Sequence, residues 1–348
     1  MRNCPGDYPV FSSSSQGDGE IGRYGRYMFD DERITWSIDG GGKLFYRNHL
    51  KYSVTNVCGW LRVNRKDILN TRFLYFLLYN QWSNIIFDYN HKAHPSVIRN
   101  EYIIPLLPFS EQTRIVGILD TFTASIENLK QQIAERRKQY EHYRDQLLDL
   151  EGKEGVEMKT LGECVIFITD GDHQPPPKSL EGIPFVTISN IEKFSHKIDF
   201  TNTFFVSKEY YNSLKDDKKP KYGDVLYTVT GSFGIPVLVE DKSAFCFQRH
   251  IALIRPNSSI ALPKYIYHWL RTNYAIKQGE EKATGGAQKT VSLNSLRNFR
   301  FYYPSLQEQQ RIVSILDTFE ASIKNLEAQL KEREKQYEYY RNKLLTFD

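Results

Sequence analysis

The chain has 348 residues, 40% of them hydrophobic and 25% charged, with a formal net charge of +4. This length exceeds one ordinary domain, the composition excludes a disordered tail, and apolar runs such as 85–87 are too short to span a bilayer. The four cysteines stand far apart and the first thirty residues do not resemble a signal peptide, so we expect a cytoplasmic protein with reduced thiols and no membrane partner.

Residues 1–107 are predicted to form a first globular domain. Alternating apolar residues at 45–46 and 51–57, separated by three glycines at 40–42, indicate strands and turns. Residues 68–82 carry apolar and aromatic side chains at helical spacing, which predicts a helix with one buried face.

The next segment occurs twice in the chain. Residues 111–148 align without a gap with residues 308–345, and about two thirds of the positions are identical. Apolar residues at heptad positions a and d predict two long helices, at 108–150 and 304–348. The residues expected to pair the helices are Ile115, Leu119, Phe122, Ile126 and Leu129 in the first copy and Ile312, Leu316, Phe319, Ile323 and Leu326 in the second.

Two copies separated by one domain favour antiparallel pairing within the chain, and a generic dimerisation tail is the alternative. Arg136 and Arg333 occupy polar a positions and are expected to fix the register of the pair. Ser305 followed by Glu308 is a capping-box pattern and predicts the start of the second helix.

A charged linker at 151–157 precedes a second predicted domain at 158–303. This domain contains predicted strands and a predicted helix, in the runs 183–188, 225–229, 237–239 and 244–254 for the strands and 263–277 for the helix. The expected fold class is therefore α+β, with two tandem α/β domains that are each followed by a long helix.

The basic excess lies in the two globular parts. Residues 1–107 contain 13 Lys+Arg against 10 Asp+Glu, and residues 158–303 contain 19 against 14, whereas the helices and linker are net acidic. This distribution is the one expected for domains that contact phosphates, although the excess is modest.

No pattern indicates catalysis or a metal site. The glycines at 40–42 lack the Lys-Ser/Thr of a phosphate-binding loop, and His91-x-x-His94 lacks the Glu of a zinc site. Residues 170–173 are better explained as a polar turn. We therefore predict no catalytic residue, no metal and no cofactor.

Two similar halves, each with a helix that opens with EQ-x-RIV-x-ILD, resemble the specificity (S) subunit of type I restriction–modification systems. Further similar segments lie at 172–174, 182–186, 222–226, 231–234 and 247–249 in the second half and at 7–11, 35–36, 40–42 and 53–59 in the first.

The resemblance implies a non-catalytic subunit that binds double-stranded DNA. Each target-recognition domain would read one half of a split site, while the helices set the spacing and dock methyltransferase subunits, two in number, which restriction subunits then join. A coiled-coil scaffold without DNA readout and a self-sufficient methyltransferase are the competing hypotheses.

Candidate DNA contacts are polar residues on loops, since loops on a rigid scaffold present side chains to base edges. They are Asp172, His173, Gln174, Thr230, Ser232, Arg249, Gln288 and Lys289 in the second half and Ser13, Ser14, Arg23, Lys43, Asn56, His94 and Ser96 in the first. The loops at 285–291 and 93–97 are paired in this set because they align at a common offset of 194.

The first half is the shorter one. The block from residue 159 to about residue 181 has no counterpart in residues 1–107. We expect a shortened first recognition domain, which fits a truncated gene, a silent specificity cassette, or a domain whose missing strands come from another chain.

Overall fold

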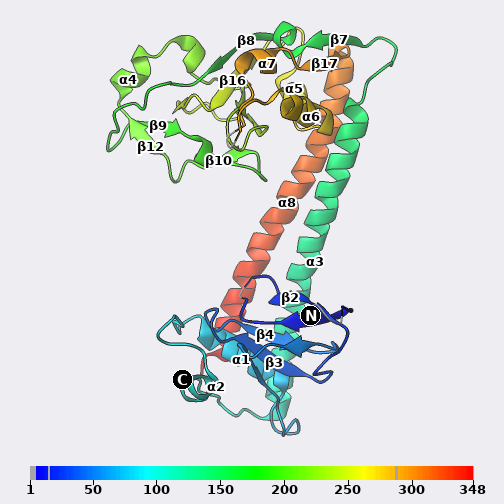
Figure 1. Cartoon of the computed structure of the whole chain (residues 1–348), viewed down its shortest axis with the longest axis vertical. Helices are drawn as coiled ribbons and strands as arrows, with labels where there is room; N and C mark the ends of the chain where they lie inside the picture. The colour runs from blue at the N-terminus through cyan, green and yellow to red at the C-terminus, as the bar shows by residue number, and fades with distance from the viewer. Residues whose placement is uncertain (1–4, 15, 287–288, 348) are drawn as a thin grey trace. The chain divides into compact units, whose positions relative to one another are not determined.

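The computed structural model describes residues 5–14, 16–286 and 289–347, which divide into two compact units. The first unit comprises Met1–Gln131 with Leu326–Asp348, and the second comprises Gln132–Asn325. Two long helices, α3 (Phe109–Leu148) and α8 (Leu306–Leu345), contribute a part to each unit (Figure 1). Helices and strands are mixed in both units, which confirms the predicted α+β class.

The first unit contains two three-stranded sheets. The strands are β1 (Tyr8–Phe11), β2 (Glu20–Tyr24), β3 (Arg33–Ser37), β4 (Leu44–Arg47), β5 (Ser53–Val54) and β6 (Cys58–Leu61). One sheet has the order β2-β1-β5 with β1 and β5 parallel, and the other has the order β4-β3-β6 with antiparallel pairs. Helices α1 (Thr71–Trp82) and α2 (Pro95–Glu101) follow, and the core between them and the second sheet includes Ile34, Trp36, Leu74 and Leu78.

The second unit repeats this plan with additions. Its strands are β7 (Glu157–Thr160), β8 (Val165–Asp170), β9 (Ile183–Val186), β10 (Ile191–Glu192), β11 (Lys197–Ile198), β12 (Phe204–Val206), β13 (Val225–Thr228), β14 (Pro236–Leu238), β15 (Cys246–Phe247), β16 (Ile251–Pro256) and β17 (Arg300–Tyr303). Its helices are α4 (Lys208–Ser213), α5 (Pro263–Leu270), α6 (Asn273–Lys282) and α7 (Leu293–Arg297), with 3-10 turns η1 (Leu161–Cys164), η2 (Ile188–Asn190) and η3 (Asp216–Lys218).

The sheets of the two units correspond strand by strand. The order β12-β9-β15, with β9 and β15 parallel, matches β2-β1-β5. The order β14-β13-β16-β8 matches β4-β3-β6 with one more strand, β8, beyond β16. A further antiparallel pair joins β7 to β17. Among the described residues of the first unit, no strand corresponds to β7 or β8.

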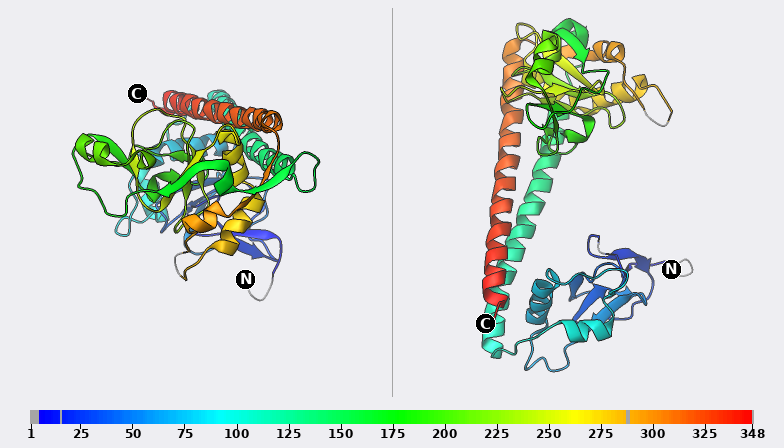
Figure 2. Two further views of the ribbon diagram at one scale, coloured as in Figure 1. Left: turned by 90° about the horizontal axis from the view of Figure 1, so that it is seen from above. Right: turned by 90° about the vertical axis from the view of Figure 1, so that its left-hand side faces the viewer.

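In the first unit, the start of α3 and the end of α8 lie side by side (Figure 2). Ile115 and Leu119 pack into one apolar cluster with Leu345 of α8 and with residues of α1. Farther along α3, the ring of Phe122 stacks on that of Tyr340, with 5.3 Å between the ring centroids. Residue numbers rise along α3 as those of their partners fall along α8, so the pairing is antiparallel.

The second unit shows the same contacts with the two helices exchanged. Phe319 of α8 stacks on Tyr143 of α3, with 5.4 Å between the ring centroids. Arg136 lies over Phe319 at 5.8 Å, as Arg333 lies over Phe122 at 5.7 Å. Each pair of partners is related by the repeat, so the helices contact each other equivalently in both units.

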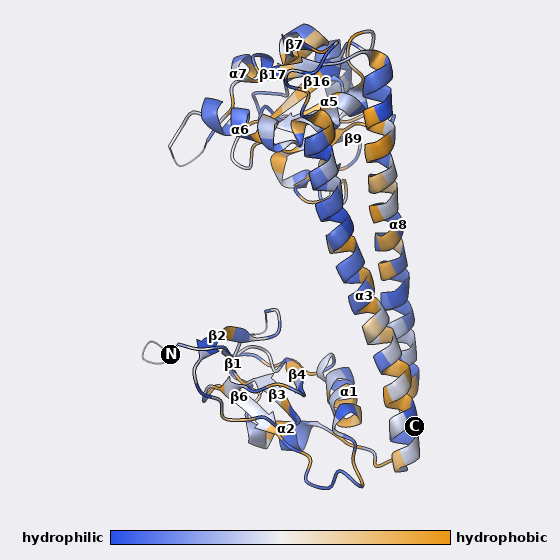
Figure 3. Ribbon diagram, turned by 90° about the vertical axis from the view of Figure 1, so that its right-hand side faces the viewer, coloured by the Kyte–Doolittle hydropathy of each residue, from blue (hydrophilic) through white to orange (hydrophobic). Residues whose placement is uncertain are grey.

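The apolar stripe predicted from the heptads faces inward. None of the ten predicted pairing residues is exposed. Figure 3 shows orange and blue alternating along both helices, as expected for a helix with one apolar stripe. The antiparallel pairing is thus confirmed within each unit. At the start of α8, Ser305 Oγ accepts the Glu308 N–H at 3.3 Å, but the Glu308 carboxylate pairs with Arg311 rather than closing the capping box.

Three predicted boundaries were wrong. The first core helix begins at Thr71 rather than residue 68, because Asn70 Oδ1 accepts the N–H groups of Arg72 and Phe73 and so caps it. The predicted helix 263–277 is two helices, since Thr272 Oγ1 accepts the N–H of Ala275 and starts α6. The predicted strand 244–254 is interrupted at 248–250, between β15 and β16.

Candidate nucleic-acid interface

Four loops of the second unit meet at one end of its four-stranded sheet. At this end β8 and β13 finish and β14 and β16 begin, as their antiparallel registers require. We call this region, formed by residues 171–174, 229–235, 248–250, 284–286 and 289–290, the loop end of the second unit.

Backbone hydrogen bonds join these loops. The Asp172 N–H donates to Phe247 O at 2.9 Å, and the Arg249 N–H donates to Asp172 O at 3.0 Å. The Val229 N–H donates to His250 O at 2.9 Å, which connects the two middle loops. These bonds fix the backbone, so the side chains on it project from a defined frame.

The fourth loop is joined to the β13–β14 turn in the same way. The Gly231 N–H donates to Lys289 O at 3.0 Å, and Thr230 and Thr290 form a β-bridge. Gln288, a predicted DNA contact, lies outside the described residues. The structure therefore gathers the other seven predicted residues of this half at one place. Of these, His173, Gln174, Ser232, Arg249 and Lys289 are exposed, whereas Asp172 and Thr230 are half-buried.

The loop that follows β8 is held by contacts of its first residues with Lys218 and His173. Lys218 Nζ donates to Asp170 Oδ1 at 3.0 Å and to Gly171 O at 3.1 Å, and His173 Nε2 lies 2.8 Å from Asp170 Oδ2. A Cβ atom at Gly171 would lie 2.0 Å from Phe247 O, so only glycine allows this close approach. Burial raises the pKa of Cys246, in the strand beneath, to about 12, which leaves a protonated thiol and no nucleophile.

The first unit has an equivalent loop end, formed by residues 12–14, 38–43, 55–57 and 93–94. The Ile38 N–H donates to Val57 O at 3.1 Å, and the Ala93 N–H donates to Ile38 O at 3.2 Å. Ser13 Oγ accepts the N–H of Asp39 at 2.7 Å. These contacts bring Ser13, Lys43, Asn56 and His94 to one end of the β4-β3-β6 sheet.

Three predicted residues of the first half are placed less well. Arg23 lies on β2, pairs with Glu20 and donates to Asp7 O, at the end of β1 remote from Ser13. Ser14 Oγ accepts the N–H of Gln16 within its own turn. Ser96 lies in the first turn of α2, beyond the loop that carries His94.

The proposed pairing of loops 93–97 and 285–291 at an offset of 194 was wrong. The Ala93 N–H donates to Ile38 O, and in the second unit Val291 makes the equivalent bond, to Val229 O at 2.9 Å. The next residue, His94 or Ser292, is then the N-cap of a short helix. His94 therefore corresponds to Ser292 rather than to Gln288, because a Gly-rich insertion precedes Val291.

One cluster among the described residues has the composition of a metal site, namely His268, Asp317 and Glu320. Lys264 Nζ lies 2.7 Å from Asp317 Oδ2, and Arg271 pairs with Glu320. Burial raises the pKa of Asp317, but hydrogen bonds from His268 and Lys264 outweigh it and hold the pKa below its usual value. Cations of the chain thus already neutralise both carboxylates, and the cluster attaches α5 to α8.

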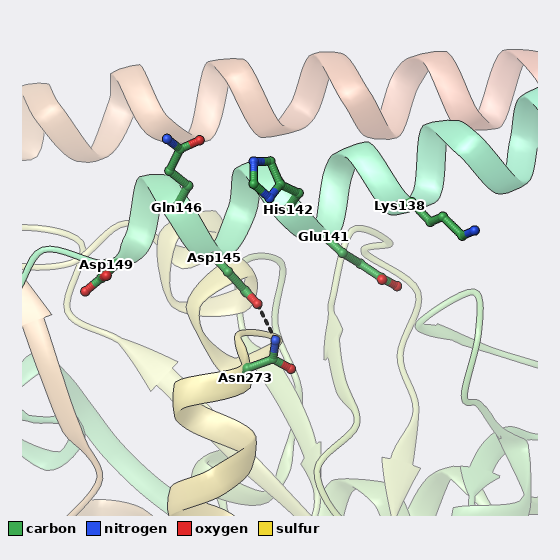
Figure 4. Close-up of a pocket in the computed structure, with 7 residues that line it drawn as sticks. All are labelled: Lys138, Glu141, His142, Asp145, Gln146, Asp149 and Asn273. Carbon is green, nitrogen blue, oxygen red and sulfur yellow. Dashed lines mark hydrogen bonds between the residues drawn. The ribbon is translucent and has the colours of Figure 1, made fainter.

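An open hollow of about 590 Å³ lies beside α3 in the second unit (Figure 4). It is lined by Lys138, Glu141, His142, Asp145, Gln146, Asp149 and Asn273. Asp145 Oδ2 accepts from Asn273 Nδ2 at 2.6 Å and so joins α3 to the start of α6. The hollow is shallow and polar, and nothing in it resembles a catalytic arrangement.

Comparison with known proteins matches residues 2–136 and 154–334 to the type I restriction modification DNA specificity domain. The chain belongs to this family. The match covers both globular parts and most of both long helices.

Relatives and solved structures agree with this family. A type I specificity subunit of Mycoplasma pneumoniae is 28% identical over 100% of this chain and 92% of its own length. One of Haemophilus influenzae is 30% identical over 94% of this chain and 82% of its own length. A crystal structure of the S subunit from M. genitalium matches 99% of this chain and 90% of that chain, with a TM-score of 0.63 and 16% identity, which supports the fold.

No helix in the described part of the chain is long and apolar enough to cross a membrane.

In this specificity-domain chain, sequence reasoning missed two buried glutamines. Gln112 Oε1 accepts the N–H of Asn70 at 2.9 Å, and its Nε2 donates to Ile68 O and Leu107 O, both at 2.8 Å. Each of these groups belongs to the backbone around α1 or before α3. The side chain thus fixes the long helix to the globular part at an interior point.

Gln309 makes the same three bonds in the second unit. Its Oε1 accepts the N–H of Leu262 at 2.9 Å, and its Nε2 donates to Ile260 O and Pro304 O, both at 3.0 Å. Gln112 and Gln309 are both fully buried. The signal was available, because the repeated EQ-x-RIV motif keeps this glutamine in both copies while its neighbour changes from Thr113 to Gln310.

Proposed function

We propose that this member of the specificity family directs a type I restriction–modification complex to a split DNA target. Each globular part, residues 1–107 and 158–303, acts as a recognition domain and reads one half of the target through its loop end. The long helices separate the two readers and dock two methyltransferase subunits, which restriction subunits join. Catalysis comes from those partners, and this chain contributes specificity.

The gathering of polar loops at one sheet end carries the proposal. Base edges are read by polar side chains held on a rigid frame, and the loop end of the second unit provides this with Arg249, Lys289 and Gln174 exposed on hydrogen-bonded loops. The net positive charge of both globular parts favours approach to phosphates.

Relatives support the partners. One matched structure describes complex assembly and conformational transition of the type I restriction–modification system. It matches 99% of this chain with a TM-score of 0.57 and 19% identity. A relative in Escherichia coli, 32% identical over 68% of this chain and 59% of its own length, is the specificity subunit of a type I restriction enzyme.

The test starts with the methylome of a strain with and without this gene, which identifies the target. Binding of the assembled complex to that DNA is then measured for Arg249→Ala, Lys289→Ala and the charge-matched control Lys153→Ala, whose side chain is exposed in the linker. A base contact by Arg249 predicts a loss of about 1–3 kcal/mol and relaxed preference at one position, whereas a phosphate contact by Lys289 predicts uniform weakening and a salt slope lower by about one.

The control should bind as the wild type does. Equal behaviour of all three variants, or an unchanged methylome on deletion of the gene, would refute the proposed readers.

The spacing role has a separate test. Removing residues 129–135 and 326–332 deletes one heptad from each helix, keeps the a and d pattern, and shortens each helix by about 10 Å. The gap between the half-targets should then shrink by about three base pairs at ~3.4 Å each. An unchanged gap would exclude the helices as the spacer.

A further inference from the structure

In the second unit, residues 157–170 close one side of the globular part. β8 pairs along β16 from Ala252↔Asp170 to Pro256↔Val165, and β7 pairs along β17 from Arg300↔Thr160 to Tyr303↔Glu157. The turn η1 between these strands buries Leu161 and Cys164 completely. This strand–turn–strand segment therefore completes both a sheet and the core.

The equivalent positions of the first unit lack this cover. β6 corresponds to β16 and pairs with β3 along one edge, and within the described residues no strand pairs with its other edge. Trp60 on β6 is 46% exposed, whereas Leu253 at the equivalent position of β16 is fully buried. Unpaired edges with exposed apolar side chains are sites at which proteins add a strand.

Residues 103–106 correspond to β17 at the constant offset of 197 and are also uncovered. Ile104 is 42% exposed and Leu106 is 64% exposed, while Phe301, equivalent to Ile104, is 0% exposed. The apolar character of this segment is thus kept although nothing in the described first unit buries it.

One residue of the segment 103–106 has both of its backbone polar groups bound by a side chain. Gln81 Nε2 donates to Ile103 O at 2.7 Å, and Gln81 Oε1 accepts the Ile103 N–H at 3.1 Å. In the second unit Gln278 makes the same two bonds to Arg300, at 3.0 and 2.7 Å. Both glutamines therefore turn the polar groups of one residue inward.

In an extended strand alternate residues point their N–H and C=O groups to opposite sides. With a backbone extended like that of β17, the groups of Ile104 and Leu106 point outward when those of Ile103 point to Gln81, as those of Phe301 and Tyr303 point to β7. Pro105 falls at the position whose N–H the pairing does not use. The single proline of the segment is thus compatible with an added strand.

We propose that the free edge of β6 and residues 103–106 accept a strand–turn–strand segment, with the pattern of residues 157–170, from a second polypeptide. The segment carries a first strand of about four residues, a turn with two buried apolar side chains, and a second strand that begins with a run of apolar residues. A second copy of this chain is the less favoured source, because its own residues 157–170 are engaged with β16 and β17.

The probe is a synthetic peptide with the sequence of residues 157–170, added to the full chain. Hydrogen exchange should slow in residues 58–63 and 103–107 and stay unchanged in 251–256 and 300–303, where the chain's own tethered segment outcompetes free peptide. A control peptide with Lys159→Pro and Thr169→Pro should give no protection, because each proline removes a ladder donor.

Two variants of the full chain separate pairing from folding. Ile104→Pro removes the outward N–H and should weaken peptide binding at least tenfold, whereas Ile104→Ala keeps the backbone and should bind within about threefold of wild type. Slowed exchange in α1 on its own reports that the first unit is folded, and peptide-dependent slowing there would also support completion of the unit.

If about 1 mM peptide gives no added protection, the peptide binds more weakly than a Kd of about 1 mM (−4.1 kcal/mol), and the proposal is overturned. Equal binding of the two Ile104 variants would do the same. If the chain dimerises without peptide and residues 58–63 and 103–107 become protected, the segment comes from a second copy of this chain, and the proposal of a different polypeptide is overturned.

Discussion

In the second unit residues 157–170 close the sheet and the core by pairing with β16 and β17. In the first unit, β6 corresponds to β16, and no strand of the described residues pairs with its outer edge. The difference extends to the loop ends, because the loop that carries Asp172, His173 and Gln174 continues directly from β8. The first unit gathers loops from the same remaining strands without it. The shared strand arrangement therefore does not need this segment, but one of the four loops at the loop end of the second unit does.

The contacts between each globular part and the long helices differ far less between the two units. The glutamine contacts, the stacked aromatic rings and the arginine above them recur in both units. Four substitution experiments test whether the two units differ in this way, with hydrogen exchange in each unit as the readout.

The largest effect is expected at the apolar seam. Leu119→Asp and Leu316→Asp each place a carboxylate where the native side chain is fully buried, and each should cost about 5 kcal/mol of unfolding free energy and abolish docking of methyltransferase subunits. Leu→Met at both positions is the control and should cost less than about 1.5 kcal/mol. Loss in one unit only would show that the two joints are not equivalent.

The next effect should distinguish the units. Arg255 Nη2 lies 2.7 Å from Asp224 Oδ2 in a buried pair, whereas Arg62, at the matching position after β6, lies 3.6 Å from Asp31 with both side chains partly exposed. Arg255→Ala should cost about 3–5 kcal/mol because it strands a buried carboxylate. Arg62→Ala should cost at most about 1 kcal/mol. Similar losses of unfolding free energy for the two variants would contradict the proposed difference between the closed sheet of the second unit and the open sheet of the first.

The buried glutamines should again behave alike. Gln112→Ala and Gln309→Ala each leave three backbone groups without a partner and should cost about 2–3 kcal/mol. Gln→Glu keeps the acceptor and removes both donors, so it separates the two kinds of bond. A loss below about 0.5 kcal/mol would mean that water replaces the side chain.

The smallest effect concerns the stacked rings. Phe122→Leu and Phe319→Leu should each cost about 1 kcal/mol through loss of the ring stack and of the arginine above it. A double-mutant cycle with Tyr340→Leu isolates the first stack. A coupling energy of zero would mean that the stacked rings do not stabilise the pairing of α3 with α8.

The sequence predicted the parts of the molecule that depend on periodicity. Heptads require only a repeated apolar spacing, so the helices followed from residues such as Leu119 and Leu316. Their antiparallel pairing followed from the globular domain that separates the two copies in the chain. The break at Thr272 did not follow, because a capping hydroxyl competes with an apolar pattern that runs on through it.

The site was predicted by residue type and loop position rather than by geometry. Residues such as Arg249 and Lys289 proved to share one sheet end, since antiparallel strands return their loops to the same side. Arg23 did not, because a strand position cannot be told from a loop position by polarity alone. The predicted match of His94 with Gln288 was wrong because an insertion before Val291 hid its true counterpart, Ser292.

The buried glutamines have one consequence for how such chains diversify. Gln112 and Gln309 bind main-chain groups only, and every protein sequence offers those groups. A recognition domain with different side chains can therefore be spliced onto the same helix without redesign of the junction. The junction thus places no requirement on the side chains of the globular part, so that part can diverge in sequence while its attachment to the helix stays the same.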